Sequence, residues 1–244
     1  MKRYLIEFSY DGSSFWGYQK QKEGRTVQQE LEQKLTLINN GETVLVSASG
    51  RTDAGVHAFG QCAHFDLQIN ITLDKLKMAL NSLLDGDIYV RNVKEVDSDF
   101  HARFLVKKKE YIYKINLGEY NPLERNYVYQ YNKNLDVDSM KKAIKYFEGE
   151  HSFESFTKAN VETDDFVRTI ISAEIEEIDN KLIIHFIGTG FLRYMVRNIV
   201  GFLIEVGEGK RKPEEVMDIL EKKDRREAGK TDEPQGLYLN KVFY

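Results

Sequence analysis

The sequence predicts an α+β fold whose strands pair mainly in antiparallel fashion. Stretches of alternating hydrophobicity, typical of half-buried strands, are interleaved with stretches of helical periodicity. Two strand-like runs meet at Asp179-Asn180-Lys181, a polar triplet that indicates a tight hairpin. Alternation favours antiparallel pairing over a doubly wound parallel sheet, because parallel strands are buried on both faces and are apolar throughout. We expect two α/β subdomains of similar size, residues 1–105 and 106–244.

The first half opens with a strand and a clear helix start. Hydrophobic residues alternate through 4–10, which predicts a half-buried strand. Thr26, followed three residues later by Gln29, forms a capping box and predicts a helix that continues to about residue 38. The other elements predicted here are strands at 44–49, 61–67 and 88–96 and a helix over 76–84.

The second half repeats this style of interleaved elements. Pro213, followed by Glu214 and Glu215, predicts a helix start, because proline suits the first turn and acidic groups favour the positive helix end. The other elements predicted are strands at 110–117, 128–131, 173–178, 182–188 and 237–244 and helices over 137–147 and 191–206.

The helix predicted over 191–206 is apolar on nearly every face, which is typical of a buried helix. Its only cationic side chains, Arg193 and Arg197, are one turn apart and would share a stripe. A buried arginine without a partner is costly. At least one of the two should therefore meet a carboxylate or a phosphate, unless both reach solvent at the helix edge.

Composition places the chain among ordinary globular proteins. Its hydrophobic content is 41% and its charged content 30%, so global disorder is not expected. The start of the sequence lacks the apolar core of a signal peptide, and no run approaches the length of a membrane span, so we expect a cytoplasmic protein. The single cysteine, Cys62, excludes an internal disulfide and any multi-cysteine zinc site.

Charge is unevenly distributed along the chain. The net charge of −4 argues mildly against a nucleic-acid partner, but distribution matters more than the sum. Residues 103–114 carry five cationic side chains against one glutamate, and 193–212 carry five against two. These stretches could hold a phosphate backbone, and ordinary solvated surface would look the same.

Residues 49–58, SGRTDAGVHA, are too polar for a core and too irregular for a helix. A turn with Asp53 bonding its own backbone and Gly55 at positive φ is the simpler interpretation. A metal site of Asp53 and His57 with nearby Cys62 and His64 has no common ligand spacing, and a retaining glycosidase would need a second carboxylate. Arg51 favours a reaction centre, because its side chain can emerge beside Asp53 and keep the acid ionised.

The motifs of this sequence are similar to those of the tRNA pseudouridine synthase A family. GRTDAGVHA at 50–58 is identical to the family signature. The remaining motifs follow in family order: SYDGSSFWGYQ (9–19), GRTVQQELE (24–32), GQCAHFD (60–66), DFHARF (99–104), KEYIYKI (109–115), GFLRYMVRNIVG (190–201), VGEGKR (206–211) and GLYLNKVFY (236–244).

The resemblance implies a fold and an activity. The fold would be a mixed, mainly antiparallel sheet shared by two α/β subdomains, with a basic cleft between them. The activity would be isomerisation of uridine to pseudouridine in the anticodon stem-loop of tRNA, at positions 38, 39 and 40. No cofactor or metal would be needed, and the enzyme would be a homodimer.

The resemblance also assigns roles to four residues. Asp53 would be the catalytic nucleophile, acting on a flipped-out nucleotide. Tyr111, in the K-x-Y-x-Y pattern, would stack on the target base, and Arg51 would lie near the flipped nucleotide. Arg197 would pair with Asp53 and so provide the partner that the apolar helix requires.

Two stretches depart from the family pattern. Trp16 precedes the glycine in SFWGYQ, where the family commonly places tryptophan after it, and 156–170 is unusually acidic. These departures leave open a family paralogue with another RNA target. A second alternative is a non-catalytic RNA-binding module with Tyr111 and Tyr113 as a stacking platform. It would leave Asp53 unexplained, because a carboxylate facing RNA repels phosphate.

Overall fold

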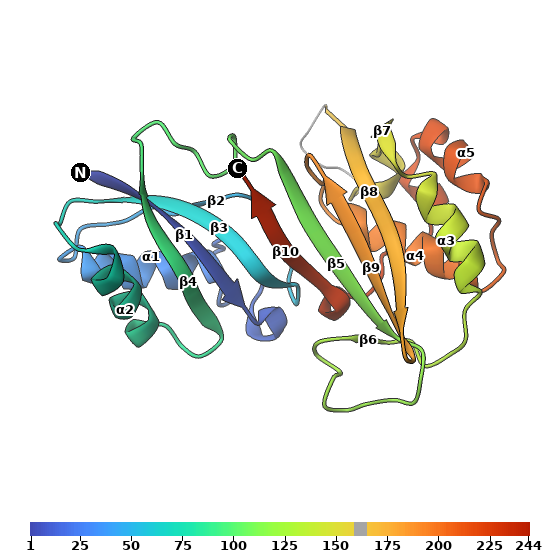
Figure 1. Ribbon diagram of the computed structural model, residues 1–244, viewed down its shortest axis with the longest axis horizontal. Coiled ribbons are helices and arrows are strands. Elements are labelled where there is room, and N and C mark those ends of the chain that lie inside the picture. The colour runs from blue at the N-terminus through green and yellow to red at the C-terminus, as the bar shows by residue number, and fades with distance from the viewer. Residues whose placement is uncertain (159–164) are drawn as a thin grey trace. The chain divides into compact units, whose positions relative to one another are not determined.

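The computed structural model describes residues 1–158 and 165–244 and divides them into two compact units (Figure 1). Unit 1 comprises Met1–Lys107 and Tyr238–Tyr244, and unit 2 comprises Lys108–Leu237. The middle of the acidic stretch at 156–170 lies outside the described residues.

Unit 1 is built on a mainly antiparallel sheet with strand order β4-β1-β3-β10. The strands are β1 (Lys2–Tyr10), β2 (Ser47–Ala48), β3 (His57–Leu67), β4 (Ile88–Val96) and β10 (Leu237–Phe243). β1 lies between β3 and β4 with antiparallel registers on both sides, and β2 pairs with β3. Alternate residues of β1 are buried, as the period of two predicted.

β10 is the exception in this sheet, because it runs parallel to β3, with Tyr238 opposite His57. The division after residue 105 would assign all of β10 to the second subdomain. Parallel pairing across so long a sequence separation has no local sequence signal. The boundary between subdomains therefore stays a proposal.

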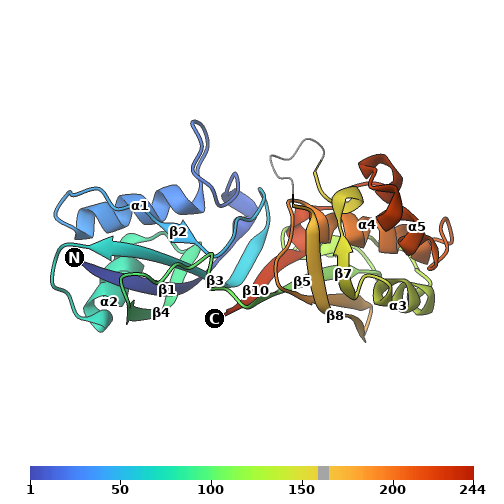
Figure 2. The ribbon, with the colours of Figure 1, turned by 90° about the horizontal axis from the view of Figure 1, so that it is seen from above.

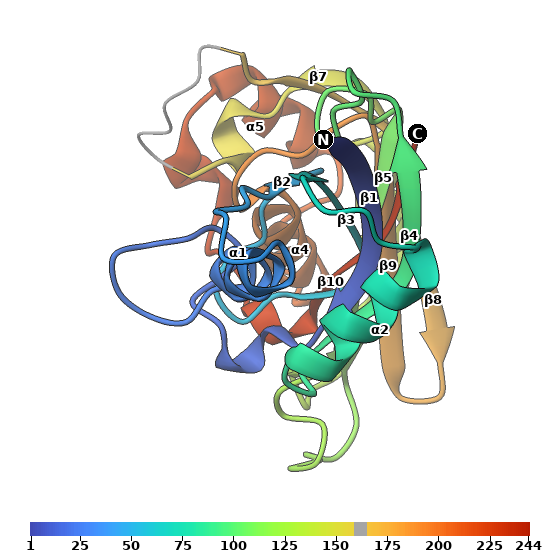
Figure 3. The same cartoon turned by 90° about the vertical axis from the view of Figure 1, so that its left-hand side faces the viewer.

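Two helices complete unit 1, α1 (Val27–Ile38) and α2 (Leu73–Leu83). The predicted start of α1 is confirmed, since the Thr26 side chain caps it by accepting from the Gln29 backbone N–H. α2 packs against β4 (Figure 3) and starts a few residues before the first leucine of its predicted face, because Thr72 caps it.

The strand predicted at 44–49 is wrong over most of its length. Val44 and Val46 are buried, as their hydrophobicity required. Their backbone N–H groups, however, donate to the Thr36 hydroxyl and the Glu32 carboxylate of α1. Side chains of the helix thus replace the ladder of a neighbouring strand, and only Ser47–Ala48 pairs with β3.

The strands of unit 2 are also mainly antiparallel, with the order β5-β9-β8-β7 and with β6 parallel to β5. Its strands are β5 (Lys108–Asn116), β6 (Tyr129–Gln130), β7 (Gly149–Ser152), β8 (Val167–Ile178) and β9 (Lys181–Gly188). The predicted hairpin is confirmed: β8 and β9 pair through Ile178 and Lys181, and Asp179 adopts a left-handed φ of 54°.

Three α-helices complete unit 2, α3 (Val137–Lys145), α4 (Met195–Gly207) and α5 (Glu215–Lys222). α4 is buried along almost its whole length, as predicted. It starts later than predicted, because Tyr194 has a φ of 65°, which no right-handed helix accommodates. Arg193 therefore precedes the helix, and the expected stripe of Arg193 and Arg197 on one helical face is wrong.

The α+β class with mainly antiparallel strands is confirmed in both units. Of the helices in the described ranges 1–158 and 165–244, none combines the length and the hydropathy that a membrane span requires.

Candidate active site

The signature loop runs from the end of β2 to the start of β3 in unit 1. The Val56 backbone N–H donates to the Asp53 carbonyl at 3.2 Å, and Gly55 has the expected positive φ, 78°, so a turn is formed by main-chain groups. The Asp53 side chain is half-buried, and Arg51 is exposed. A turn and a reactive carboxylate are therefore compatible here, because the turn occupies main-chain groups.

Neighbouring segments brace Thr52, the residue before Asp53. The Tyr10 hydroxyl, at the end of β1, lies 2.7 Å from the Thr52 hydroxyl in a buried position. The Thr52 carbonyl accepts from the Tyr18 backbone N–H at 3.0 Å. The loop is thus attached both to the central strand of unit 1 and to the connection that leads into α1.

The start of the loop is held by a buried pair of polar side chains. The Ser49 hydroxyl donates to Gln61 Oε1 at 2.7 Å, and Gln61 Nε2 donates to the Gly50 carbonyl at 3.1 Å. Ser49 and Gln61 are both fully buried. Because buried polar groups need partners, this network specifies the path of the chain into the loop.

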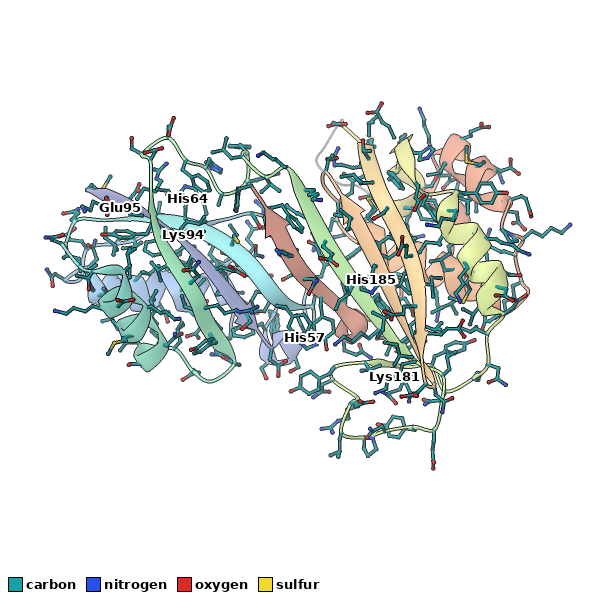
Figure 4. The ribbon with its side chains drawn as sticks, viewed as in Figure 1. His57, His64, Lys94, Glu95, Lys181 and His185 are labelled. Atoms are coloured by element: carbon teal, nitrogen blue, oxygen red, sulfur yellow. The ribbon has the colours of Figure 1, made fainter. Side chains whose placement is uncertain are left out.

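His57 holds the end of the loop (Figure 4). Its Nδ1 accepts from the Gly12 backbone N–H at 3.0 Å and lies 3.3 Å from Asp11 Oδ1. Its ring stacks on Tyr238 of β10 at a centroid distance of 4.7 Å. His57 is therefore a support for the turn at residues 11–14. The described ranges contain no group of three or more His, Cys, Asp or Glu residues that could hold a metal ion.

Arg51 is the exposed cation of this loop. In the described ranges, its side chain has no hydrogen bond or ion pair, including none with Asp53. An exposed guanidinium without a protein partner remains available to an anionic ligand such as a phosphate.

Unit 2 contains the other two predicted site residues. Tyr111, on β5, is buried and makes an edge-to-face contact with Phe191 at 5.0 Å. Arg197 lies in the first turn of α4. Its Nε donates to the Asp232 carbonyl at 2.6 Å, and its guanidinium lies 5.2 Å from the centre of the Tyr194 ring.

Tyr113 serves the core of unit 2. It is fully buried, and its hydroxyl donates to the Glu233 carbonyl at 2.6 Å. Burial raises its pKa well above the ordinary value. A side chain with no exposed surface offers no face to a nucleobase, which weakens the stacking platform of Tyr111 and Tyr113.

Asp232, which sequence reasoning missed, adjoins Arg197. It is 1% exposed, and within the described residues neither carboxylate oxygen has a hydrogen-bond partner. The nearest cation, Lys230 Nζ, is 3.7 Å from Oδ1. Burial raises the pKa of Asp232 to about 6, against the opposing effect of Lys230. No local pattern marks the residue, because its surroundings come from distant segments.

The predicted site residues thus fall into two pairs, each described within its own unit. Asp53 and Arg51 share the signature loop of unit 1, and Tyr111 and Arg197 belong to unit 2.

Comparison with known proteins identifies the chain. The profile of the tRNA pseudouridine synthase family matches residues 7–105 and 143–244. A tRNA pseudouridine synthase A of Geobacillus sp. (strain WCH70) is 49% identical over 244 residues, covering 100% of this chain and 98% of the relative. Proteins of the same name from Anoxybacillus flavithermus (49% over 244 residues) and Listeria monocytogenes (46% over 247 residues) match 100% of this chain and 99% and 100% of their own lengths.

The α+β fold and these full-length matches define an enzyme of the isomerase class. The chain belongs to the tRNA pseudouridine synthase family.

Proposed function

We propose that this protein is a cytoplasmic enzyme that converts uridine to pseudouridine in the anticodon stem-loop of tRNA, at positions 38, 39 and 40. The observation that carries the proposal is the full-length match to relatives named tRNA pseudouridine synthase A, in which 49% of residues are identical. The several braces on the loop around Asp53 support it, because a catalytic group must be held in place.

The reaction must break the bond between uracil N1 and ribose C1′ and join C5 to the same carbon. In one route, the Asp53 carboxylate attacks C1′ and uracil leaves with the electron pair of the broken bond. The base turns, C5 attacks C1′ and displaces the ester, and the C5 proton is then lost as N1 gains one. In the other route, the carboxylate takes the C2′ proton as uracil leaves with the electron pair of the N1–C1′ bond, which gives a glycal. C5 then bonds to C1′ while the proton returns to C2′, and the C5 proton is lost as N1 gains one.

The proposal assigns the remaining three residues to substrate binding. Tyr111 stacks on the target base, which offsets part of the free energy of flipping it out of the RNA. Arg51 lies near the flipped nucleotide, and the absence of any hydrogen bond or ion pair of its side chain within residues 1–158 and 165–244 supports that assignment. Arg197 pairs with Asp53 and favours its ionised form, which both routes require.

The proposed function is tested with the isosteric variant Asp53→Asn on unmodified tRNA transcripts labelled with tritium at uridine C5. We expect complete loss of tritium release with tRNA binding largely kept. Asp74→Asn is the matched control, because it removes an exposed carboxylate of the same unit and should release tritium at the wild-type rate. Product from the Asp53 variant would contradict the proposal.

Two alternatives give different results. A non-catalytic RNA-binding module would leave the pseudouridine content of tRNA unchanged with wild-type protein. A paralogue with another target would fail on these transcripts, yet pseudouridine would disappear from a different RNA in cells lacking the protein. Mapping pseudouridine across total RNA in such cells separates the two.

The proposal includes a homodimer, since the family resemblance implies one. Sedimentation of the purified chain measures this directly. A monomer at the concentrations used for the assay would contradict this part alone.

A further inference from the structure

Trp16 is the only tryptophan of the chain and is 58% exposed. Its neighbours behave differently: Phe15 and Tyr18 are each 2% exposed. Tyr18 therefore occupies the interior position after the glycine, and the indole is presented outward.

A single exposed hydrophobic residue is normal on a protein surface, so exposure alone carries no conclusion. The indole of Trp16, however, packs closely against Gly24. Gly24 has a φ of 80°, and a Cβ atom there would lie 2.4 Å from Cδ2 of the indole. One side of the ring thus rests on a glycine that no other residue could replace without displacing it.

The backbone of Trp16 is fixed as well. Its N–H donates to the Arg25 carbonyl at 2.9 Å, and its carbonyl accepts from the Gln21 side-chain amide at 2.9 Å. These bonds close the connection between η1 (Gly12–Ser14) and α1, which projects from unit 1 in Figure 2. The indole is therefore held in place before any ligand arrives.

The segment that carries Trp16 is hydrogen-bonded to the signature loop. Tyr18, two residues beyond Trp16, donates its backbone N–H to the Thr52 carbonyl, next to Asp53. The exposed ring, the carboxylate of Asp53 and the exposed guanidinium of Arg51 therefore belong to one hydrogen-bonded part of unit 1. Exposed Lys22 lies on the same connection as the ring, as does Lys20, whose Nζ is 3.1 Å from Glu32 Oε2.

A flat aromatic face accompanied by cations matches single-stranded nucleic acid, whose bases stack on rings and whose phosphates attract lysine. We propose that Trp16 is a stacking surface for an unpaired nucleobase of the RNA substrate, outside the reacting nucleotide. This inference rests on the proposed function and adds a specificity contact to it.

The first test uses the intrinsic fluorescence of the protein, which reports on Trp16 because the chain has no other tryptophan. Unmodified tRNA transcript is titrated into wild-type protein while binding is followed by gel shift. We expect tryptophan emission to be quenched in parallel with binding. Unchanged emission at saturating tRNA would overturn the inference.

The second test compares kinetic constants for tritium release. We expect Trp16→Ala to raise KM for tRNA about tenfold, with kcat changed less than about twofold, because stacking contributes to binding rather than to the chemical step. Trp16→Phe, which keeps a ring, should recover most of the loss. Gly24→Ala retains the indole but displaces it, and should raise KM as Trp16→Ala does.

The matched control is Tyr89→Ala, which removes an aromatic side chain of similar exposure, 55%, from β4. It should leave KM unchanged, and the thermal midpoint of each variant identifies any that has merely unfolded. Equal KM values for Trp16→Ala and wild type would overturn the inference. So would dissociation of an oligomer by Trp16→Ala, because the ring would then contact a second copy of the chain.

These outcomes also separate the two proposals. Product with unchanged emission and unchanged KM overturns the role of Trp16 alone. Failure of wild-type protein to bind or modify the transcript overturns the proposed function, and the stacking role falls with it.

Discussion

The hydroxyl groups of Tyr10 and Thr52 lie 2.7 Å apart in the interior of unit 1, and they connect the end of β1 to the residue before Asp53. Burial raises the pKa of Tyr10 to about 12, so the phenol stays protonated throughout the working range and can always donate. The position of the proposed nucleophile therefore depends on a neutral hydrogen bond that pH does not disturb.

Tyr10→Phe removes this bond and leaves the buried Thr52 hydroxyl without its partner. We expect the free energy of unfolding to fall by about 1 kcal/mol, the net contribution of such a bond. We also expect kcat to fall several-fold, because the loop loses a brace. Chemical denaturation and tritium release measure the two effects.

The matching control is a double-mutant cycle with Thr52→Val. If the two hydroxyls act through each other, the double variant loses less than the sum of the single variants. Strict additivity would show that they act separately.

Gly12 leaves no room for a side chain. A Cβ atom there would lie 2.0 Å from the Val56 carbonyl oxygen, and backbone atoms cannot yield as a flexible side chain can. We expect Gly12→Ala to displace the signature loop, lowering both the thermal midpoint and activity. Gly86→Ala, where an added Cβ meets nothing within 4 Å, should stay close to wild type. A Gly12→Ala protein with wild-type activity would contradict this account of the loop.

Replacing Arg51 should change tRNA binding but not the stability of the fold. Because it has no partner in the described ranges, Arg51→Ala should change the free energy of unfolding by less than about 0.5 kcal/mol. If the guanidinium meets RNA phosphate, the variant should bind tRNA more weakly and with a smaller salt dependence. Binding isotherms at several salt concentrations test this, and an unchanged salt slope would exclude a phosphate contact.

Asp232 predicts a pH dependence of stability. Its pKa is about 6 in the folded protein against 3.8 ordinarily, so between these values the folded state holds a proton that the unfolded state has lost. Stability should therefore fall as pH rises from about 4 to about 6, by about 3 kcal/mol in total.

Asp232→Asn removes this titration. The difference in unfolding free energy between variant and wild type should shift in favour of the variant over the same pH interval and stay constant above it. Burying the asparagine amide changes the unfolding free energy by the same amount at every pH, whereas the titration of Asp232 changes it only between about pH 4 and about pH 6. Measuring the difference between variant and wild type across the pH range therefore separates the two effects. A constant difference across the interval would contradict the elevated pKa.

Much of the fold follows from local sequence signals. The Thr26 cap and the turn at Asp179 were predictable because each depends on residues within a few positions. The predictions of element boundaries failed where tertiary contacts determine the local backbone conformation. Val44 has the hydrophobicity of a strand residue, but its N–H bonds to a helix side chain, and the left-handed Tyr194 delays α4 for reasons outside its own sequence.

For the candidate site, too, some residues could be predicted from the sequence and others could not. Asp53 and Arg51 were identified from their motif, whereas the role of Tyr10 depends on a contact that spans 42 positions. Asp232 follows an ordinary polar connection in the sequence, and only its burial distinguishes it. Sequence patterns indicate which groups can react, and tertiary contacts determine which groups hold them.

The parallel pairing of β10 with β3 has a consequence for biosynthesis. The sheet of unit 1 combines strands that are synthesised before unit 2 with β10, which is synthesised after it. Unit 2, encoded in between, can fold while synthesis continues, since domains generally fold as units in the order they emerge. Unit 1 must wait for β10, so the sheet that carries the signature loop is completed only after unit 2 has been synthesised.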